Sequence, residues 1–279
     1  MAAKHTKVAI AYDFDGTLAK GNIQENSFIP DLGMSNNAFW KEVGELAKEN
    51  EMDEILAYMY LLIQRAKQHG RVTFRKEELK KHGGNVQYFN GVKTYFDRIN
   101  MYARSQGIKI EHYIISSGTK EMIEGTSIAK YFKYIYASSF KYDGNDVPEW
   151  PAMAINYTTK TQFLFRINKG VENVWDNSKI NQYISKEKRP IPFERMIYIG
   201  DGLTDVPAMK LVKEQGGVSI GVYAPKSRKK LAVNQLLNEN RVSYIAPADY
   251  TANSDLDKII KATIDKIAAV ESIVKFSQK

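Results

Sequence analysis

The chain of 279 residues contains no cysteine. This absence excludes disulfide bonds, thiolate nucleophiles and metal sites built from cysteine. No apolar run reaches the roughly 18 residues that a membrane-spanning helix needs, so we expect no membrane association. The first residues, MAAKHTK, are followed by only a short apolar run before Asp13, which is not the pattern of a secretory signal peptide. We therefore expect a cytoplasmic location.

Acidic residues are fewer than basic ones, and the formal net charge is +8. A positive net charge can favour the binding of nucleic acid or of an anionic small substrate. The densest basic stretch, KSRKK at residues 226–230, has no interleaved aromatic residues and is typical of a solvated helix start. The composition, 43% hydrophobic and 26% charged, is that of a globular protein. We expect no nucleic-acid partner.

Short apolar runs rich in Ile, Val and Tyr alternate with helical patterns along most of the chain. The runs predicted to be strands are Val8–Tyr12, His112–Ile115, Tyr134–Ala137, Met196–Ile199, Val218–Val222 and Ser243–Ile245. Two marked helical patterns cover residues 91–107 and 254–276, and Ser254 can cap the second. This alternation predicts an α/β fold: a doubly wound parallel sheet with helices on both faces.

Residues 19–89 break the alternation, because they contain helical patterns and no strand pattern. The helical patterns cover residues 36–50, 52–70 and 73–83, and Thr73 lies ahead of Glu77 and Glu78 in a loose capping signal. We predict a helical cap domain at 19–89, inserted after the first strand of a core domain formed by 1–18 and 90–279. The insert's aromatic residues, Phe39, Trp40, Tyr58 and Tyr60, are interpreted as its core. Residues 138–157 indicate a turn-rich hairpin or flap.

Polar residues follow three of the predicted strands. Asp13 and Asp15 follow the first strand in VAIAYDFDGTLAK. The second is followed by Ser116, Ser117, Gly118 and Thr119, and the fourth by Asp201 and Asp205 in MIYIGDGLTD. Lys160 opens a predicted helix, KTQFLFRINKG. Because ligands bind beyond the carboxyl ends of parallel strands, we expect these groups at one edge of the sheet.

Clustered carboxylates repel one another and raise one another's pKa, and a divalent cation removes that problem. An all-oxygen cluster without cysteine or nearby histidine suits Mg²⁺. Lys160 and the Ser116 hydroxyl suit phosphoryl oxygens. The backbone N–H groups of Ser117 and Gly118, where we expect a helix to begin, are further anion donors. These are the groups that phosphoryl transfer requires.

The segments DFDGT, IISSG, a later lysine and GDGLTD resemble, in this order, the four motifs of the haloacid dehalogenase (HAD) superfamily. The helical insert resembles a type-1 cap, and the layout is similar to phosphoserine-phosphatase-like members. The resemblance implies a Rossmann-like core and a Mg²⁺-dependent phosphoric monoester hydrolase. It also implies a small phosphorylated metabolite as substrate and an aspartyl-phosphate intermediate.

The resemblance implies a role for each motif residue. Asp13 is the implied nucleophile. Asp15 is the implied acid that protonates the leaving oxygen and the base that then activates water. The implied phosphate-binding residues are Ser116, Ser117, Gly118 and Lys160. The implied metal ligands are Asp13, Asp15 through its backbone carbonyl, Asp201, and Asp205, which binds the metal or orients its water and the lysine.

Plainer interpretations of the same residues stay open at this point. Asp13 and Asp15 could start a turn, and Asp205 could only cap the helix that follows it. Ser116 could be a helix cap, with Ser117 as its competitor for the phosphate. Lys160 could be a solvated helix residue, with Lys169 or Lys141 in its place.

Other functions also compete. A phosphomutase on the same core would hand the phosphoryl group to a second alcohol. The charge of +8 motivates a polynucleotide-end phosphatase, and a non-catalytic binding protein on the same fold is a third class. Phosphoserine is not named as the substrate, because Asn22 stands near the place where phosphoserine phosphatases usually have a glutamate, and Glu25 follows only a turn later.

Overall fold

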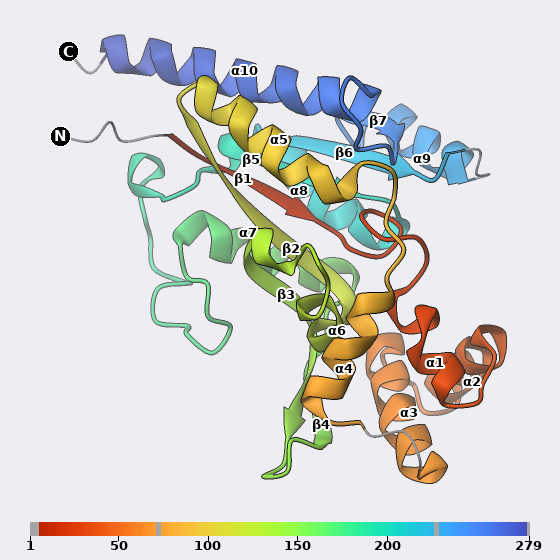
Figure 1. Ribbon diagram of the computed structural model, residues 1–279. Coiled ribbons are helices and arrows are strands. Elements are labelled where there is room, and N and C mark those ends of the chain that lie inside the picture. Colours follow the sequence, from red (N-terminus) through yellow and green to blue (C-terminus); the bar gives the residue numbers. More distant parts are fainter. Residues whose placement is uncertain (1–5, 71–73, 226–228, 278–279) are drawn as a thin grey trace.

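Seven strands form one sheet in the order β4-β3-β2-β1-β5-β6-β7 (Figure 1). The computed structural model describes residues 6–70, 74–225 and 229–277. The strands are β1 (Thr6–Tyr12), β2 (Ile108–Thr119), β3 (Phe132–Tyr142), β4 (Pro148–Met153), β5 (Met196–Gly200), β6 (Val218–Tyr223) and β7 (Tyr244–Pro247). All neighbouring strands are parallel except β3 and β4, which are antiparallel. The predicted α/β fold with a parallel sheet is confirmed.

The central strand, β1, is buried on both faces. In its register, Ile10 lies beside His112 of β2 on one side and Ile197 of β5 on the other. Its alternate side chains enter two separate hydrophobic clusters, with Val8, Ile10 and Tyr12 in one and Ala9 and Ala11 in the other. Alternation along a strand sends neighbouring side chains to opposite faces, which is why β1 reads as a continuous apolar run.

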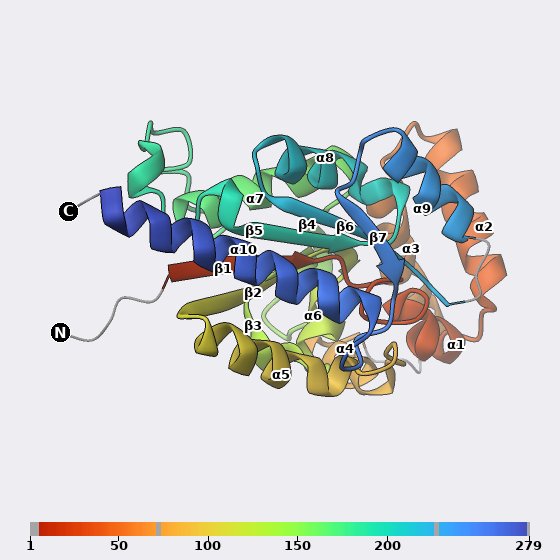
Figure 2. The same ribbon diagram turned by 90° about the horizontal axis from the view of Figure 1, so that it is seen from above.

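Helices cover both faces of the sheet (Figure 2). Helices α5 (Val92–Ser105) and α10 (Asp255–Ser277) pack on one face, and α7 (Lys160–Lys169) and α8 (Val206–Glu214) pack on the other. The Ser254 hydroxyl accepts a hydrogen bond from the Asp257 amide at 3.1 Å, which confirms the predicted cap of α10. Residues 226–228 of the basic stretch lie outside the described residues. Its last two residues, Lys229 and Lys230, begin helix α9 (Lys229–Asn238). No helix in the described ranges is both long and apolar enough to cross a membrane.

The second strand is longer than its apolar core predicts. β2 continues to Thr119, whose partner in β3 is Ser138 across an irregular step in the ladder. The prediction that a helix begins at Ser117 and Gly118 is therefore wrong, because both residues lie within β2, between its pairs with β3 at Ser116 and Thr119. The short helix α6 (Lys120–Glu124) follows the strand instead. The predicted hairpin at 138–157 is present as the β3–β4 pair.

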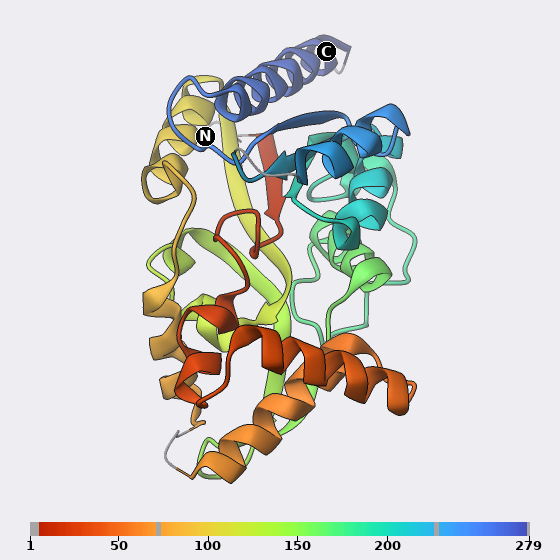
Figure 3. The same cartoon turned by 90° about the vertical axis from the view of Figure 1, so that its right-hand side faces the viewer.

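The insert between β1 and α5 is helical. Its helices are α1 (Phe28–Asp31), α2 (Asn36–Glu49), α3 (Glu54–His69) and α4 (Lys76–His82). Ser35 caps α2 and Asp53 caps α3, which ends at Gly70 in a left-handed conformation. Thr73 lies outside the described residues, and Arg75 occupies the N-cap position of α4. Figure 3 shows these red and orange helices at the end of the sheet where β1 stops.

The two chain segments that enter and leave the insert pair with each other. The Lys20 amide donates to the Gln87 carbonyl at 2.7 Å, and the Phe89 amide donates to the Leu18 carbonyl at 3.1 Å. The insert thus begins and ends next to the residues that follow β1. The division into domains at residues 18 and 90 stays a prediction.

Candidate active site

Three carboxylates meet at the carboxyl ends of β1 and β5. Oxygen atoms of Asp13, Asp201 and Asp205 all lie within 4.8 Å of one another. The Asp13 amide donates to the Ile199 carbonyl at 2.9 Å, which joins the end of β1 to β5. The sequence prediction that these acids lie together at one sheet edge is confirmed.

Lys160 lies between two of these carboxylates. Its side chain is only 1% exposed, and its Nζ atom donates to Asp13 Oδ1 at 3.0 Å and to Asp205 Oδ1 at 2.7 Å. Burial lowers the pKa of Lys160, but Asp13 and Asp205 outweigh burial and raise it above its ordinary value. The lysine is therefore a charged bridge between the two acids.

The alternative lysines lie elsewhere. Lys169 donates to the carbonyls of Ile180 and Gln182, and Lys141 pairs with Glu149. Neither contacts the acidic cluster. The structure thus places Lys160, rather than Lys169 or Lys141, beside Asp13.

Asp205 is held from both of its oxygens. Besides Lys160, the Tyr198 hydroxyl donates to Asp205 Oδ1 at 2.7 Å, and the Gly202 amide donates to Oδ2 at 3.3 Å. Asp205 occupies the N-cap position of α8, but its side chain does not cap that helix. Tyr198 was not among the site residues predicted from the sequence. Its signal is a tyrosine within a buried strand, since a buried phenol needs a hydrogen-bond partner.

The carboxylates of the first motif have raised pKa values. Burial raises the pKa of Asp13 most, and the negative charge of Asp205 raises it further. Lys160 lowers this pKa, but the result is still a rise to about 7. Burial, with Asp13 next, raises the pKa of Asp15 well above its ordinary value, against a hydrogen bond of 2.9 Å from the Ile23 amide to its Oδ1. Asp15 therefore keeps its proton at a higher pH than a solvated aspartate and can act as an acid.

Glycines let the motif acids approach the backbone. Gly16 has φ +74°, and a Cβ atom there would lie 2.2 Å from Asp201 Oδ2. At Gly118 a Cβ atom would lie 2.8 Å from Asp15 Oδ2. A side chain at either position would displace a carboxylate of the cluster.

The Ser116–Gly118 segment faces the same acids. Ser116 is fully buried, and its Oγ atom accepts a hydrogen bond from the Gly118 amide at 2.9 Å. This amide therefore already has a partner within the segment. The Ser117 carbonyl accepts a hydrogen bond of 2.7 Å from the hydroxyl of Tyr58 in α3, so the insert contacts the core here.

A cavity of about 400 Å³ lies between the core and the insert. The core side of its lining includes Asp13, Asp15, Ser116, Ser117, Gly118, Lys160 and Asp201. The insert contributes Asn22, Gln24, Trp40, Glu54, Ile55 and Tyr58. Phe39 is fully buried, as the core interpretation of the aromatic residues predicts, and Tyr60 is 43% exposed. Tyr58 is also in the hydrophobic core and Trp40 packs against it, although both line this cavity as well, so the core interpretation is wrong for Tyr60 alone.

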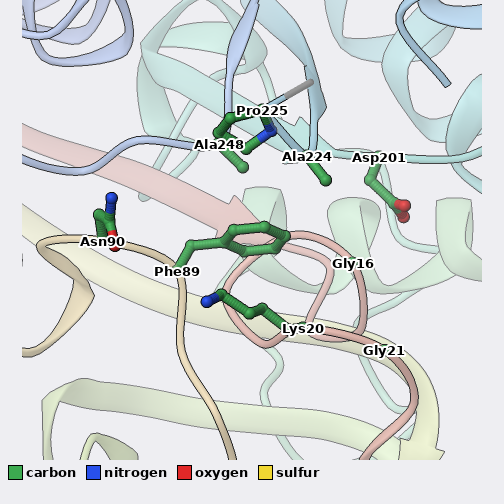
Figure 4. A pocket seen from close by; sticks show the side chains of 9 residues that line it. All are labelled: Gly16, Lys20, Gly21, Phe89, Asn90, Asp201, Ala224, Pro225 and Ala248. Atoms are coloured by element: carbon green, nitrogen blue, oxygen red, sulfur yellow. The ribbon is translucent and has the colours of Figure 1, made fainter. Parts of the chain in front are cut away.

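A second cavity, of about 570 Å³, shares Gly16, Gly21 and Asp201 with the first. Figure 4 shows Lys20 and Phe89, from the segments that enter and leave the insert, on one side of this cavity. The loop residues Ala224, Pro225 and Ala248 lie opposite them. Asp201 is the one acidic residue among the described residues that line it. The acid pair Asp13 and Asp15 faces the first cavity only, so we assign the chemistry there.

The sequence profile of the haloacid dehalogenase-like hydrolases matches residues 10–210. The chain belongs to this family. An uncharacterized protein of Borreliella burgdorferi is 29% identical, over 92% of this chain and 96% of that protein.

Solved structures share the fold of this haloacid dehalogenase-like hydrolase. A phosphoserine phosphatase in its apo form is 14% identical with a TM-score of 0.55, over 91% of this chain and 98% of that one. A probable phosphoserine phosphatase from Vibrio cholerae is 11% identical with a TM-score of 0.57, over 95% of this chain and 67% of that one. A HAD family hydrolase from Salmonella enterica serovar Typhi is 20% identical with a TM-score of 0.52, over 82% of this chain and 66% of that one. At these identities the likeness extends to the fold alone.

The acidic cluster of this hydrolase fits a hard divalent cation. Asp13, Asp201 and Asp205 offer oxygen ligands only, and one ligand atom of each lies within 4.8 Å of the others. Carboxylate oxygens gathered in this way are the ligands that a hard divalent ion takes.

Proposed function

We propose that this hydrolase is a Mg²⁺-dependent phosphatase that acts on a small phosphate monoester through a phosphoryl group carried on Asp13. The observation that supports it best is the Lys160 bridge, which holds Asp13 and Asp205 together at the sheet edge with Asp201 beside them. A buried lysine at a buried carboxylate can offset the charge that gathers when a phosphoryl group arrives.

The reaction has two steps. First, a carboxylate oxygen of Asp13 attacks phosphorus, the bond from phosphorus to the ester oxygen breaks, and Asp15 gives its proton to that leaving oxygen. Then Asp15 takes a proton from water, the water oxygen attacks phosphorus, and the bond to Asp13 breaks. Inorganic phosphate leaves, Asp15 carries its proton again, and Asp13 returns as a carboxylate.

The surrounding residues position the phosphoryl group. The Ser116 hydroxyl and the Lys160 ammonium are the donors that face it; Asp205 accepts a hydrogen bond from Lys160, and Tyr198 donates to Asp205. The residues that would hold Mg²⁺ are Asp13, Asp201 and the backbone carbonyl of Asp15. When bound, the ion supplies positive charge that offsets the charge of the phosphoryl oxygens.

The cavity favours a small substrate over the end of a polynucleotide. Its described lining carries four carboxylates, at Asp13, Asp15, Glu54 and Asp201, against one cation, Lys160. A nucleic-acid groove would be lined by basic residues. No observation favours a phosphomutase or a non-catalytic role, and the cytoplasmic location stays a prediction.

Hydrolysis of p-nitrophenyl phosphate by the purified chain tests the proposal. We expect turnover with Mg²⁺, none with EDTA, and none in Asp13→Asn. The matched control is Asp255→Asn, an exposed aspartate at the start of α10, which should keep wild-type activity. Full activity without metal, or in Asp13→Asn, would contradict the proposal.

A further inference from the structure

The insert's side of the 400 Å³ cavity has a chemical character of its own. Its residues are two aromatic rings, two amides, one aliphatic side chain and one carboxylate: Trp40, Tyr58, Asn22, Gln24, Ile55 and Glu54. This wall shares its cavity with Asp13 and Asp15, so the leaving group of a phosphate ester bound at these acids lies in the same space. The wall therefore selects the leaving group.

We propose, on the basis of the phosphatase function above, that the leaving group is an amino alcohol: it carries an ammonium group and no carboxylate. Glu54, on the first turn of α3, would pair with the ammonium group. Trp40 would contact it through its ring.

Glu54 is placed to take a cation. It and Tyr58 are four residues apart on α3 and therefore lie on the same helix face. The Tyr58 hydroxyl contacts the Ser117 carbonyl, and Glu54 lines the same cavity about one helical turn along α3 from Tyr58. The structure shows no ion pair for the Glu54 carboxylate among the described residues.

The aromatic residues form a corner rather than a stack. The ring centroids of Trp40 and Tyr58 are 5.9 Å apart, and the ring planes meet at 69°. Tyr58 is 2% exposed and Trp40 is partly exposed, so Trp40 is the ring available to an alkylammonium group, which aromatic rings attract through their negative faces. The Trp40 N–H donates to Glu25 Oε1 at 2.6 Å, which places another carboxylate beside the indole.

The same wall disfavours a carboxylate on the leaving group. Lys160 is the cation in the described lining, and it is already bonded to Asp13 and Asp205. The N-terminus of α3 could attract an anion, but Asp53 Oδ1 already accepts from the amides of Ile55 and Leu56 at 2.9 and 3.1 Å. A leaving-group carboxylate would meet Glu54 without a partner.

A substrate panel with the purified full chain and Mg²⁺ tests the proposal. The probes are phosphoethanolamine, phosphocholine, glycerol 3-phosphate, phosphoserine and p-nitrophenyl phosphate. We expect kcat/KM for one or both amino-alcohol phosphates to exceed that for phosphoserine by roughly tenfold or more, since like charges placed together are strongly disfavoured. Glycerol 3-phosphate, neutral in its leaving group, should fall between them.

Glu54→Gln removes the negative charge of this side chain and keeps its size, so it tests the contribution of that charge alone. It should lower the ratio of kcat/KM for phosphoethanolamine to that for glycerol 3-phosphate by about fivefold, the size of a partly exposed ion pair. Glu49→Gln, at an exposed position at the end of α2, is the control and should leave that ratio unchanged.

The outcomes separate this inference from the function on which it rests. Turnover of p-nitrophenyl phosphate with a preference for phosphoserine or glycerol 3-phosphate would overturn the amino-alcohol proposal alone. An unchanged ratio in Glu54→Gln would do the same. No turnover of any probe, with a folded protein, would overturn the phosphatase proposal itself.

Discussion

The acid pair Asp13 and Asp15 is separated by one residue, yet the two carboxylates have different surroundings. Lys160 donates to Asp13, whereas the Ile23 amide donates to Asp15. The first contact stabilises a negative carboxylate next to the phosphoryl group. The second contact lowers the pKa of Asp15, but burial and the charge of Asp13 outweigh it, so the pKa stays raised and the proton stays available. Environment, rather than residue type, thus assigns the nucleophile and the acid.

The two residues should therefore fail differently when changed to asparagine. Asp13→Asn removes the nucleophile and should abolish turnover of every substrate. Asp15→Asn removes the proton donor, and its cost should depend on the leaving group, because general acid catalysis contributes roughly 10²–10⁴-fold when the leaving oxygen needs a proton. We expect a larger loss with alkyl phosphates than with p-nitrophenyl phosphate. Single-turnover kinetics on both substrate types measures the difference, and equal losses would remove Asp15 from the acid role.

Glu111, away from the active site, forms ion pairs with Lys7 and Lys133 that should stabilise the fold. Burial raises the pKa of Glu111, but hydrogen bonds from Lys133, Lys7 and Tyr113 outweigh it and lower the pKa from its usual 4.5 to about 2. A carboxylate whose pKa is lower in the folded chain stabilises the fold above its unfolded pKa, and this contribution disappears as the pH falls through its folded pKa.

Glu111→Gln should thus lower the free energy of unfolding by about 1–2 kcal/mol above pH 5, a modest value because both lysines are partly exposed. The difference from wild type should shrink as the pH falls toward 2. Urea unfolding across this pH range measures it. A difference that grows at low pH would contradict the assignment.

At the scale of elements, the insert's helix α2 serves two purposes with adjacent residues. Phe39 is fully buried in the packing between the helices, whereas Trp40 reaches the cavity, and their rings meet edge to face at 5.2 Å. Phe39 thus supports the ring that faces the substrate.

Phe39→Ala should lower the free energy of unfolding by about 3–5 kcal/mol, the usual cost of removing a buried phenylalanine side chain. Tyr60→Ala, at a side chain that is 43% exposed, should cost much less and is the control. Chemical denaturation of both variants checks this. Similar losses at the two positions would show that Phe39 does not anchor the insert.

The elements also show what the sequence can and cannot predict. All six predicted strands are present, since buried parallel strands leave an unmistakable apolar run. The edge strand β4 was not predicted as a separate strand. Trp150 and its neighbours are largely exposed there, so the segment has no apolar pattern. The end of β2 was also missed, since its pairing with β3 through Thr119 and Ser138 is a tertiary contact.

For the site, motif spacing predicted the core side of the cavity and not the insert's side. Asp13, Asp201 and Asp205 follow strands whose order in the sheet makes them neighbours. Glu54 and Trp40 lie on separate helices with ordinary amphipathic patterns, and only the packing of the insert shows which of their faces lines the cavity.

At the scale of the whole molecule, the chain has a net charge of +8, yet the described residues that line the catalytic cavity carry four carboxylates and one lysine. A divalent cation should therefore stabilise the folded chain. We expect the melting temperature to rise with added Mg²⁺, because an ion that binds only the folded state adds to its stability. Asp201→Asn should lose most of this shift, and the exposed control Asp255→Asn should keep it. Thermal unfolding with and without Mg²⁺ measures both, and an equal shift in Asp201→Asn would remove Asp201 from the ion site.

The central claim, that Asp13 carries the phosphoryl group, has a direct test in mass spectrometry of the quenched enzyme. Rapid acid quenching of the Asp15→Asn variant during turnover should trap the intermediate, since the water that would release it is no longer activated. Peptide mapping should then show one added phosphoryl group on Asp13 that hydroxylamine removes. A phosphoryl group on Ser116 or Ser117 instead, or turnover with no phosphorylated peptide in either the variant or the wild type, would contradict the account.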